Sequence, residues 1–193
     1  METASLQAFL SALYPLAEEE MNALTGIWKP FSARRKTVLT ASGETERYLY
    51  FVQEGVQRAF HITPGGREAT IVFTYPPSFS GVADSFLTGL PSRYYLETLT
   101  ASSFLRTSRP QLQEVQDRYP AVQQLLFTAT AHVLRGTLER QIELQCYSAE
   151  DKFRALLKRS PHVLNLIPHK YLANYLGLDP ATFSKLLGTI RVE

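Results

Sequence analysis

The side chains whose types and spacing best suit a defined chemistry lie near the end of the chain, and that chemistry is contact with nucleic acid. Hydroxyl, amine and imidazole groups recur there within two short segments of helical character. Hydroxyls and lysines can hydrogen-bond to base edges, and basic groups can pair with backbone phosphates. The candidate DNA-binding residues are His169, Lys170, Ala181, Thr182, Ser184 and Lys185.

These candidates divide into two roles. Thr182, Ser184 and Lys185 are expected to face the major groove, where Ala181 offers only a methyl group for contact with thymine. The other two, His169 and Lys170, open the preceding segment and are expected to meet phosphates.

Two short helices must position these side chains. Gly177 stands where a first helix has to stop and the backbone needs a positive φ. Asp179 then suits the N-cap of a second helix and Pro180 its first position, while Ala173 is small where the helices must pack closely. The apolar sites of the pair are Leu172, Leu176, Leu178, Phe183 and Leu186. The pattern predicts a helix-turn-helix whose second helix enters the major groove, with a helical hairpin in a core as the alternative.

The charge distribution agrees with a nucleic-acid partner. The 193 residues include 20 Lys+Arg and 18 Asp+Glu, a net charge of +2. From Tyr147 onward there are seven basic and four acidic residues, which gives +3 for that part and −1 for the remainder. A basic end on a nearly neutral body suits phosphate contact.

The remaining reactive side chains form no catalytic set. Cys146 is the only cysteine, which excludes an internal disulfide and any multi-cysteine metal site, and its apolar neighbours predict a packed thiol. No nucleophile elbow or phosphate-binding glycine loop is present. The histidines show no pair at metal-ligand spacing and are His61, His132, His162 and His169. We therefore expect no enzymatic activity, no metal and no cofactor.

The chain also lacks the signals of a membrane or secreted protein. No stretch approaches the ~20 apolar residues that span a bilayer. The first ten residues contain neither a basic region nor a sustained apolar run, so no signal peptide is expected. These features predict a cytoplasmic protein without membrane contact.

Short alternating segments in the first half predict strands. They are residues 37–40, 48–52, 56–62, 68–74, 94–99 and 103–107. Their spacing of about 8–12 residues, with turn signals between them, is typical of a small all-β barrel or roll. Apolar residues at helical spacing precede the strands, over residues 5–27.

A long helix is predicted between Pro120 and Tyr147, because no proline interrupts this stretch. About 25 helical residues span ~37 Å, which exceeds what a small β-domain can cover. We predict that the helix pairs with its copy in a homodimer through Val122, Leu125, Ala129, Val133 and Gly136. A core helix lying across the barrel is the alternative.

The resulting organisation is an α+β chain of three parts. Residues 1–118 are predicted to form the roll with its N-terminal helices, residues 119–147 the dimerisation helix, and residues 148–193 the DNA-binding domain.

Several motifs in this order resemble the Crp/Fnr-type transcription regulators. In the roll they are Ser42-Gly43-Glu44, residues 48–56, residues 65–68 and residues 79–86; near the end, residues 167–185 resemble the DNA-binding segment of that family. The resemblance covers essentially the whole chain. It implies a double-stranded β-helix or jelly-roll of the cyclic-nucleotide-binding type, a homodimer and duplex DNA as partner. RNA polymerase and a small-molecule effector are further candidate partners.

The effector pocket implied by the resemblance is degenerate. In cyclic-nucleotide binders of the family, a Gly-Glu pair holds the ribose and an Arg-Ser pair about ten residues later holds the phosphate. Gly81 is kept here, but Val82 replaces the glutamate, and Ser92 and Arg93 stand at the Arg and Ser positions. A strand alternates its faces, so Arg93 is expected to point away from the pocket.

This loss should abolish useful affinity for cyclic AMP. Two missing charge-assisted contacts cost several kcal/mol, which is about a thousandfold or more in affinity. On the long helix, Thr137 and Leu138 stand at the purine-contacting hydroxyl pair of the family, so one hydroxyl remains.

The sequence therefore leaves three candidate functions. The first is a homodimeric, DNA-binding transcription regulator that cyclic AMP does not control. The second is a small-molecule binding module whose helical tail contacts other proteins. An enzyme on a cupin-like roll is third, and the scattered histidines argue against it.

Overall fold

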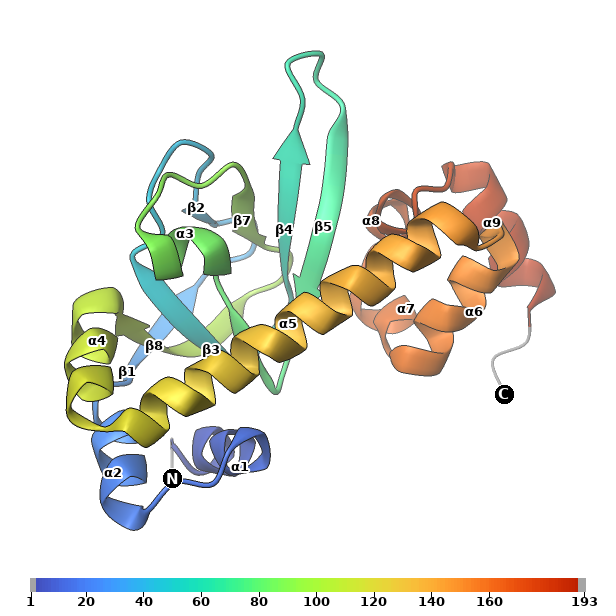
Figure 1. Cartoon of the computed structure of the whole chain (residues 1–193). Coiled ribbons are helices and arrows are strands. Elements are labelled where there is room, and N and C mark those ends of the chain that lie inside the picture. The colour runs from blue at the N-terminus through green and yellow to red at the C-terminus, as the bar shows by residue number, and fades with distance from the viewer. Residues whose placement is uncertain (1–2, 191–193) are drawn as a thin grey trace.

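The computed structural model describes residues 3–190 and places a β-roll and a helical module at the two ends of one long helix (Figure 1). The chain begins with α1 (Ala4–Leu13) and α2 (Glu18–Gly26), which lie under the start of the long helix. Strands β1 to β8 then build the roll, interrupted by α3 (Ala83–Thr88). The predicted order of roll, long helix and C-terminal helices is confirmed.

The roll consists of two antiparallel sheets of four strands. One has the order β1-β8-β3-β6, with bounds Lys29–Ala33, Ser102–Ser108, Tyr48–Glu54 and Ser78–Ser80. The other has the order β2-β7-β4-β5, with bounds Val38–Thr40, Tyr95–Thr98, Gln57–Ile62 and Glu68–Thr74. All six predicted strands are present. The sequence pattern missed β1, β6 and α3.

The missed elements are short or irregular, and this explains why periodicity did not reveal them. β1 contains Pro30 and pairs only with β8, so it is an edge strand, where a proline is tolerated. β6 has three residues and follows the Pro76-Pro77 pair. Elements of this length carry too few side chains for a periodic pattern.

The two faces of the first sheet support different structures. Its inner face contributes Tyr50, Val52 and Phe104 to the interior of the roll. Its outer face contributes Phe51 and Leu105 to a second core against α1, α2, α4 (Arg109–Arg118) and the first turns of the long helix α5 (Pro120–Cys146). The sheet therefore fixes where α5 begins.

The predicted dimer face of α5 is wrong at its first two residues. Val122 and Leu125 are fully buried against α1, α2 and α4 of the same protomer, so neither can contact a partner. Further along the same side of the helix, Arg140 and Glu143 are buried where α5 meets the helical module. This side of α5 therefore packs against its own chain at both ends of the helix, around Val122 and Leu125 and around Arg140 and Glu143.

A different stripe on α5 is apolar and exposed. Phe127, Leu134, Leu138 and Ile142 are between 52% and 69% exposed and recur every four or seven residues on the side opposite Val122 and Leu125. The predicted residue Val133 is also 60% exposed, but it lies on the side of α5 that carries Val122 and Arg140. Ala129 is half-buried, and a Cβ on Gly136 would meet no atom within 4 Å.

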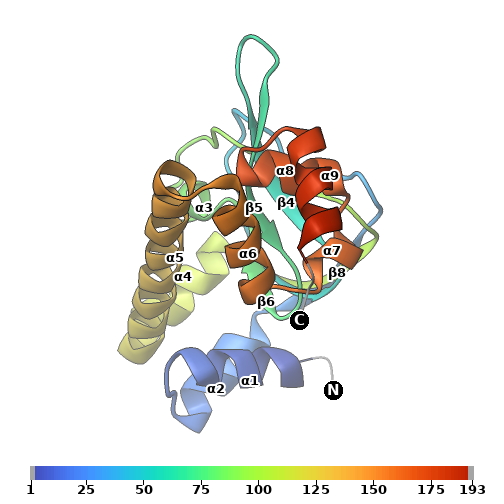
Figure 2. The same ribbon diagram turned by 90° about the vertical axis from the view of Figure 1, so that its right-hand side faces the viewer.

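The helical module contains α6 (Ala149–Arg159), α7 (Val163–Leu166), α8 (His169–Leu176) and α9 (Pro180–Thr189). Its core is formed around Phe153 and Phe183, whose rings meet edge to face at 5.3 Å. Val56 and Leu99 of the roll belong to the same core. Figure 2 shows the module in front of β4 and β5, to which it is joined by direct packing as well as by α5.

Candidate nucleic-acid interface

The turn between α8 and α9 has the conformation that the sequence predicts. Gly177 ends α8 in the left-handed region at φ 67°, and its N–H donates to the carbonyls of Ala173 and Asn174. Asp179 caps α9 by accepting a hydrogen bond from the N–H of Thr182 at 2.9 Å. Leu172, Ala173, Leu176 and Phe183 are at most 1% exposed beneath the two helices.

Three of the predicted groove residues share one exposed face of α9. Ala181, Ser184 and Lys185 are exposed at the spacing of one helical turn. Thr182 is half-buried, and its hydroxyl donates to Asp179 Oδ2 at 2.5 Å. The Thr182 hydroxyl is therefore directed to the N-cap residue Asp179 and belongs to the cap of α9.

The two predicted phosphate contacts lie at the start of α8. His169 and Lys170 are both exposed in the first turn of that helix. The His169 ring lies 5.6 Å from the ring of Phe183 in α9, and the ammonium of Lys170 lies 4.7 Å from the ring of Tyr171. The side chains of His169 and Lys170 thus lie on the first helix of the hairpin whose second helix carries Ser184 and Lys185.

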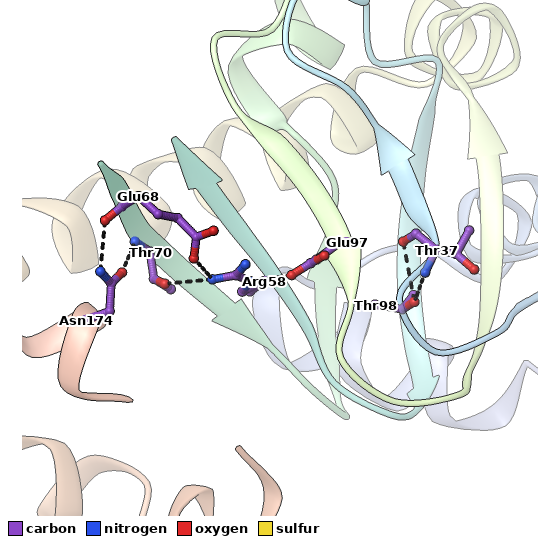
Figure 3. Close-up of polar contacts among 7 residues, drawn as sticks. All are labelled: Thr37, Arg58, Glu68, Thr70, Glu97, Thr98 and Asn174. Carbon is purple, nitrogen blue, oxygen red and sulfur yellow. Dashed lines mark hydrogen bonds and ion pairs between the residues drawn. The ribbon is translucent and has the colours of Figure 1, made fainter. Parts of the chain in front are cut away.

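Asn174 joins this hairpin to the edge strand of the roll. Its Oδ1 accepts from the N–H of Thr70 at 2.6 Å, and its Nδ2 donates to the carbonyl of Glu68 at 2.9 Å, as Figure 3 shows. The amide thereby makes the two hydrogen bonds that a neighbouring strand would make along β5. An edge strand presents such unpaired groups, so one side chain suffices to dock α8.

Arg58 lies directly beneath this junction and is 3% exposed. Its guanidinium donates to Glu97 and Glu68 at 2.5 Å each, bridging β7 and β5 (Figure 3). The same group lies 4.0 Å from the ring of Tyr171 in α8 and 4.1 Å from the ring of Phe60. The second sheet of the roll and the helix-turn-helix are therefore connected through one buried cation.

A second ionic cluster fixes the far end of α5. Arg140 donates to Glu143 at 2.8 Å and to the carbonyl of Tyr175 in α8, and Arg159 of α6 also pairs with Glu143. Burial by itself would raise the pKa of the Glu143 carboxyl, but the bonds to Arg159 and Arg140 outweigh burial and lower that pKa. The helical module is thus held to α5 by charge as well as by apolar packing.

Most of the predicted effector-pocket residues are buried or hydrogen-bonded within the chain. Val82 is 3% exposed and packs in the roll interior. The Ser92 hydroxyl donates to the carbonyl of Tyr94 at 2.7 Å, while Arg93 is exposed and its carbonyl lies 2.9 Å from His61 Nδ1. Arg93 lies in the bend that precedes β7 (Tyr95–Thr98), so the predicted strand alternation does not apply to it. On α5, the Thr137 hydroxyl donates back to the carbonyl of Val133.

Glu46 is a functional candidate that the sequence did not indicate. It is 2% exposed, and its carboxylate accepts from the Thr40 hydroxyl at 2.6 Å and from the N–H groups of Tyr48 and Val82 at 3.2 Å. A Cβ on Gly81 would lie 3.9 Å from Glu46 Oε2, so this carboxylate occupies space beside the degenerate pocket. Burial raises the pKa of the Glu46 carboxyl, and the three donors offset only part of that effect.

Replacing Glu46 by glutamine should change how stability depends on pH. Between the ordinary value of 4.5 and the raised pKa, the folded state retains a proton that the unfolded state has lost. Wild-type stability therefore falls as pH rises through this window, whereas glutamine cannot ionise. The free energy of unfolding of Glu46→Gln relative to wild type should increase from about pH 4 to about pH 7 in urea titrations. The exposed Glu44→Gln variant is the control, and a relative stability of Glu46→Gln that is constant with pH would contradict the assignment.

The cysteine, the possible metal ligands and the membrane-spanning segments were also subjects of sequence predictions. Cys146 is exposed, so the expected packed thiol is wrong: its apolar neighbours Leu144 and Tyr147 are exposed as well. Within residues 3–190, no three His, Cys, Asp or Glu side chains gather at a spacing that suits a metal ion. No helix in the same range has the length and apolar content that crossing a membrane requires.

Comparisons with known proteins agree with this geometry. Residues 30–119 match the family described as the cyclic nucleotide-binding domain. The fumarate and nitrate reduction regulatory protein of Vibrio cholerae serotype O1 is 24% identical over 189 residues, covering 91% of this chain and 74% of that protein. Regulatory protein HlyX of Actinobacillus pleuropneumoniae is 22% identical over 187 residues, covering 91% and 77%.

Solved structures show the same architecture. FixK2 from Bradyrhizobium japonicum superposes with a TM-score of 0.76 at 21% identity, covering 84% of each chain. The two sequence relatives carry the names of regulatory proteins rather than of enzymes. Residues 30–119 thus match the cyclic nucleotide-binding domain family, and the chain as a whole is similar in sequence to these regulatory proteins and has the fold of the Crp/Fnr transcription regulators.

Proposed function

We propose that this protein is a bacterial, homodimeric transcription regulator that binds duplex DNA through α8 and α9. The observation that carries the proposal is the exposed face of Ala181, Ser184 and Lys185 on a capped helix that follows the tight turn at Gly177. A recognition helix of this kind reads base edges, and the helix before it contacts the backbone. The similarity to regulatory proteins supports the same function. We assign the protein a regulatory role in the cytoplasm and no catalytic role.

Two lysines should affect DNA binding differently. Lys185→Ala on α9 should reduce the preference for the specific site by about tenfold, because a base contact contributes ~1–3 kcal/mol of discrimination. Lys170→Ala on α8 should weaken binding to all duplexes alike and lower the salt slope by about one. Fluorescence anisotropy with specific and random duplexes at several salt concentrations measures both. If both variants bind as wild type does, the helix-turn-helix does not contact DNA.

The same titration separates the alternative function. A regulator that contacts several phosphates loses affinity steeply between ~50 and ~200 mM salt. A small-molecule module whose tail contacts proteins would show no duplex binding at any salt concentration.

The dimer is proposed to form along the exposed stripe of α5. Phe127, Leu134, Leu138 and Ile142 are apolar and at least half exposed in the single chain. A contiguous apolar stripe along a helix of 27 residues, about 40 Å long, suits pairing with its own copy. Pairing would place two helix-turn-helix modules on one duplex, as dimeric DNA-binding proteins require.

Cyclic AMP should not bind with useful affinity. Val82 offers no acceptor for a ribose, and the Ser92 hydroxyl is already bonded within its own loop. Titration calorimetry with cyclic AMP and cyclic GMP at about 1 mM should give no saturable heat, because a site without charge-assisted contacts loses about a thousandfold in affinity. A dissociation constant in the low micromolar range that Arg93→Ala abolishes would show that Arg93 holds the phosphate.

A further inference from the structure

A cavity at one end of the roll is lined by other residues than the predicted effector pocket, although Glu46, which lies beside Gly81, also lines it. It has a volume of about 540 Å³ and lies at the end of the roll formed by β1, β2 and the segment between β2 and β3. Its lining includes Phe31, Thr37, Thr45, Tyr48, Tyr50 and Arg106. None of Gly81, Val82, Ser92, Arg93 and Thr137 lines it.

Arg106 is the notable group in this cavity. Its guanidinium carbon lies 4.0 Å from the ring centroid of Phe31 and 4.2 Å from that of Tyr48. A guanidinium held between two rings has its faces covered and keeps its N–H edge available for hydrogen bonds. Among residues 3–190 no ion pair joins Arg106 to a carboxylate.

Arg58 of the same protein also lies between two aromatic rings, and its N–H groups are paired with anions. Arg58 also lies about 4 Å from two aromatic rings, those of Phe60 and Tyr171. Two carboxylates, on Glu68 and Glu97, meet its N–H groups at 2.5 Å. Arg106 has the same aromatic surroundings without the anions, and open space adjoins it.

The acidic groups of the cavity do not serve as that anion. Glu46 is directed to the Thr40 hydroxyl and to backbone N–H groups, and Glu44 accepts from the N–H of Ala41 at 3.1 Å. Tyr50, whose phenol interacts with Arg106, is 2% exposed, and burial raises its pKa above the ordinary value. The phenol therefore keeps its proton and can donate to an anion beside Arg106.

We propose that this cavity binds a small organic anion, a carboxylate or phosphate carried on a flat apolar body, with Arg106 as its counter-ion. The N–H edge of a guanidinium matches such an oxyanion in a bidentate manner. The rings of Phe31 and Tyr48 provide apolar walls for the rest of the ligand, as is usual in small-molecule sites.

The position of the cavity suits a sensor of that ligand. Arg106 and Tyr50 lie on β8 and β3, and the opposite face of the same two strands carries Leu105 and Phe51. Those two residues pack in the core that holds the first turns of α5. The proposed ligand would thus bind to the two strands that support the proposed dimerisation helix.

The test uses 4-fluorobenzoate as probe and the full chain as protein, observed by fluorine NMR. A ligand of this size with one strong ionic contact should bind with a dissociation constant of about 1 mM or tighter. 4-Fluorobenzamide, which has the same shape without the charge, should not bind. Arg106→Gln should weaken 4-fluorobenzoate binding by at least about tenfold, since a charge-assisted bond is lost. Arg93→Gln, at the exposed arginine of the degenerate pocket, is the matched control and should bind as wild type does.

Three results would overturn the proposal. They are no binding of 4-fluorobenzoate to wild type, equal binding of the benzamide, and loss of binding in Arg93→Gln but not in Arg106→Gln. An observation on wild type alone protects the test against a poorly folded variant: nuclear Overhauser effects should connect the probe to the rings of Phe31 and Tyr48. Their absence while the probe binds would place it elsewhere. None of these measurements involves DNA, so the proposal can fail without affecting the proposed function.

Discussion

Replacing Leu138 by glutamate should dissociate the proposed dimer and abolish tight binding to DNA. Leu138 is 52% exposed in the single chain, in the middle of the apolar stripe of α5. In a two-fold dimer one substitution places two carboxylates in the interface, and burying an unpaired charge costs several kcal/mol. The dimer dissociation constant should therefore rise by about a thousandfold. Sedimentation velocity measures the change directly, and anisotropy measures the loss of DNA affinity.

His132→Glu is the matched control for this prediction. His132 is exposed on the same helix but lies away from the stripe, so the same new charge should leave the dimer intact. Circular dichroism should show unchanged helix content in both variants, because neither side chain is buried in the protomer. A Leu138→Glu protein that remains dimeric would show that α5 does not pair through this stripe.

Replacing Arg58 by methionine should lower the free energy of unfolding more than the Glu46→Gln or Arg35→Met substitution does. The variant leaves the carboxylates of Glu97 and Glu68 without the cation that bridges them, and the Glu97 side chain is only 15% exposed. Removing one partner of a buried ion pair costs about 3–5 kcal/mol. Because the Glu68 side chain is 37% exposed and partly solvated, we expect the lower end, about 3 kcal/mol.

Urea unfolding at neutral pH measures this effect. Arg35→Met is the control, since Arg35 is exposed and the same substitution there should be nearly neutral. The double variant Arg58→Met/Glu97→Gln should recover part of the stability, because one uncompensated charge is removed with the cation. If Arg58→Met unfolds at the wild-type urea concentration, the bridge between the sheet and α8 contributes nothing to stability.

Local signals were sufficient for most elements of this fold, with β1, β6 and α3 as the exceptions. The turn at Gly177 and the cap at Asp179 depend on a few consecutive residues, and both are found where the sequence predicts them. The same holds for strands such as β5, which has the bounds 68–74 expected from alternation. The class of the protein followed from the order of these elements.

The contacts of individual side chains were less predictable. Thr182 was expected to face DNA, yet its hydroxyl completes the cap of its own helix. Glu46 was not singled out by any sequence pattern, yet it is a buried acceptor for donors far along the chain, including the N–H of Val82. Arg106 gave no signal in the sequence, because Phe31 and Tyr48 reach it from other strands.

The long helix α5 shows most clearly which features follow from the sequence and which depend on tertiary packing. The sequence by itself determined that α5 is a long helix, since helix formation depends on residues within a few turns. It also determined the two helices α8 and α9 and the turn between them. Only the tertiary structure decided which residues of α5 are covered by its own chain and which are left exposed. Two apolar sides have the same period, and the one containing Val122 and Leu125 is covered by α1, α2 and α4 of its own chain. Part of that cover comes from α1, more than a hundred positions away in the sequence, which no local pattern contains.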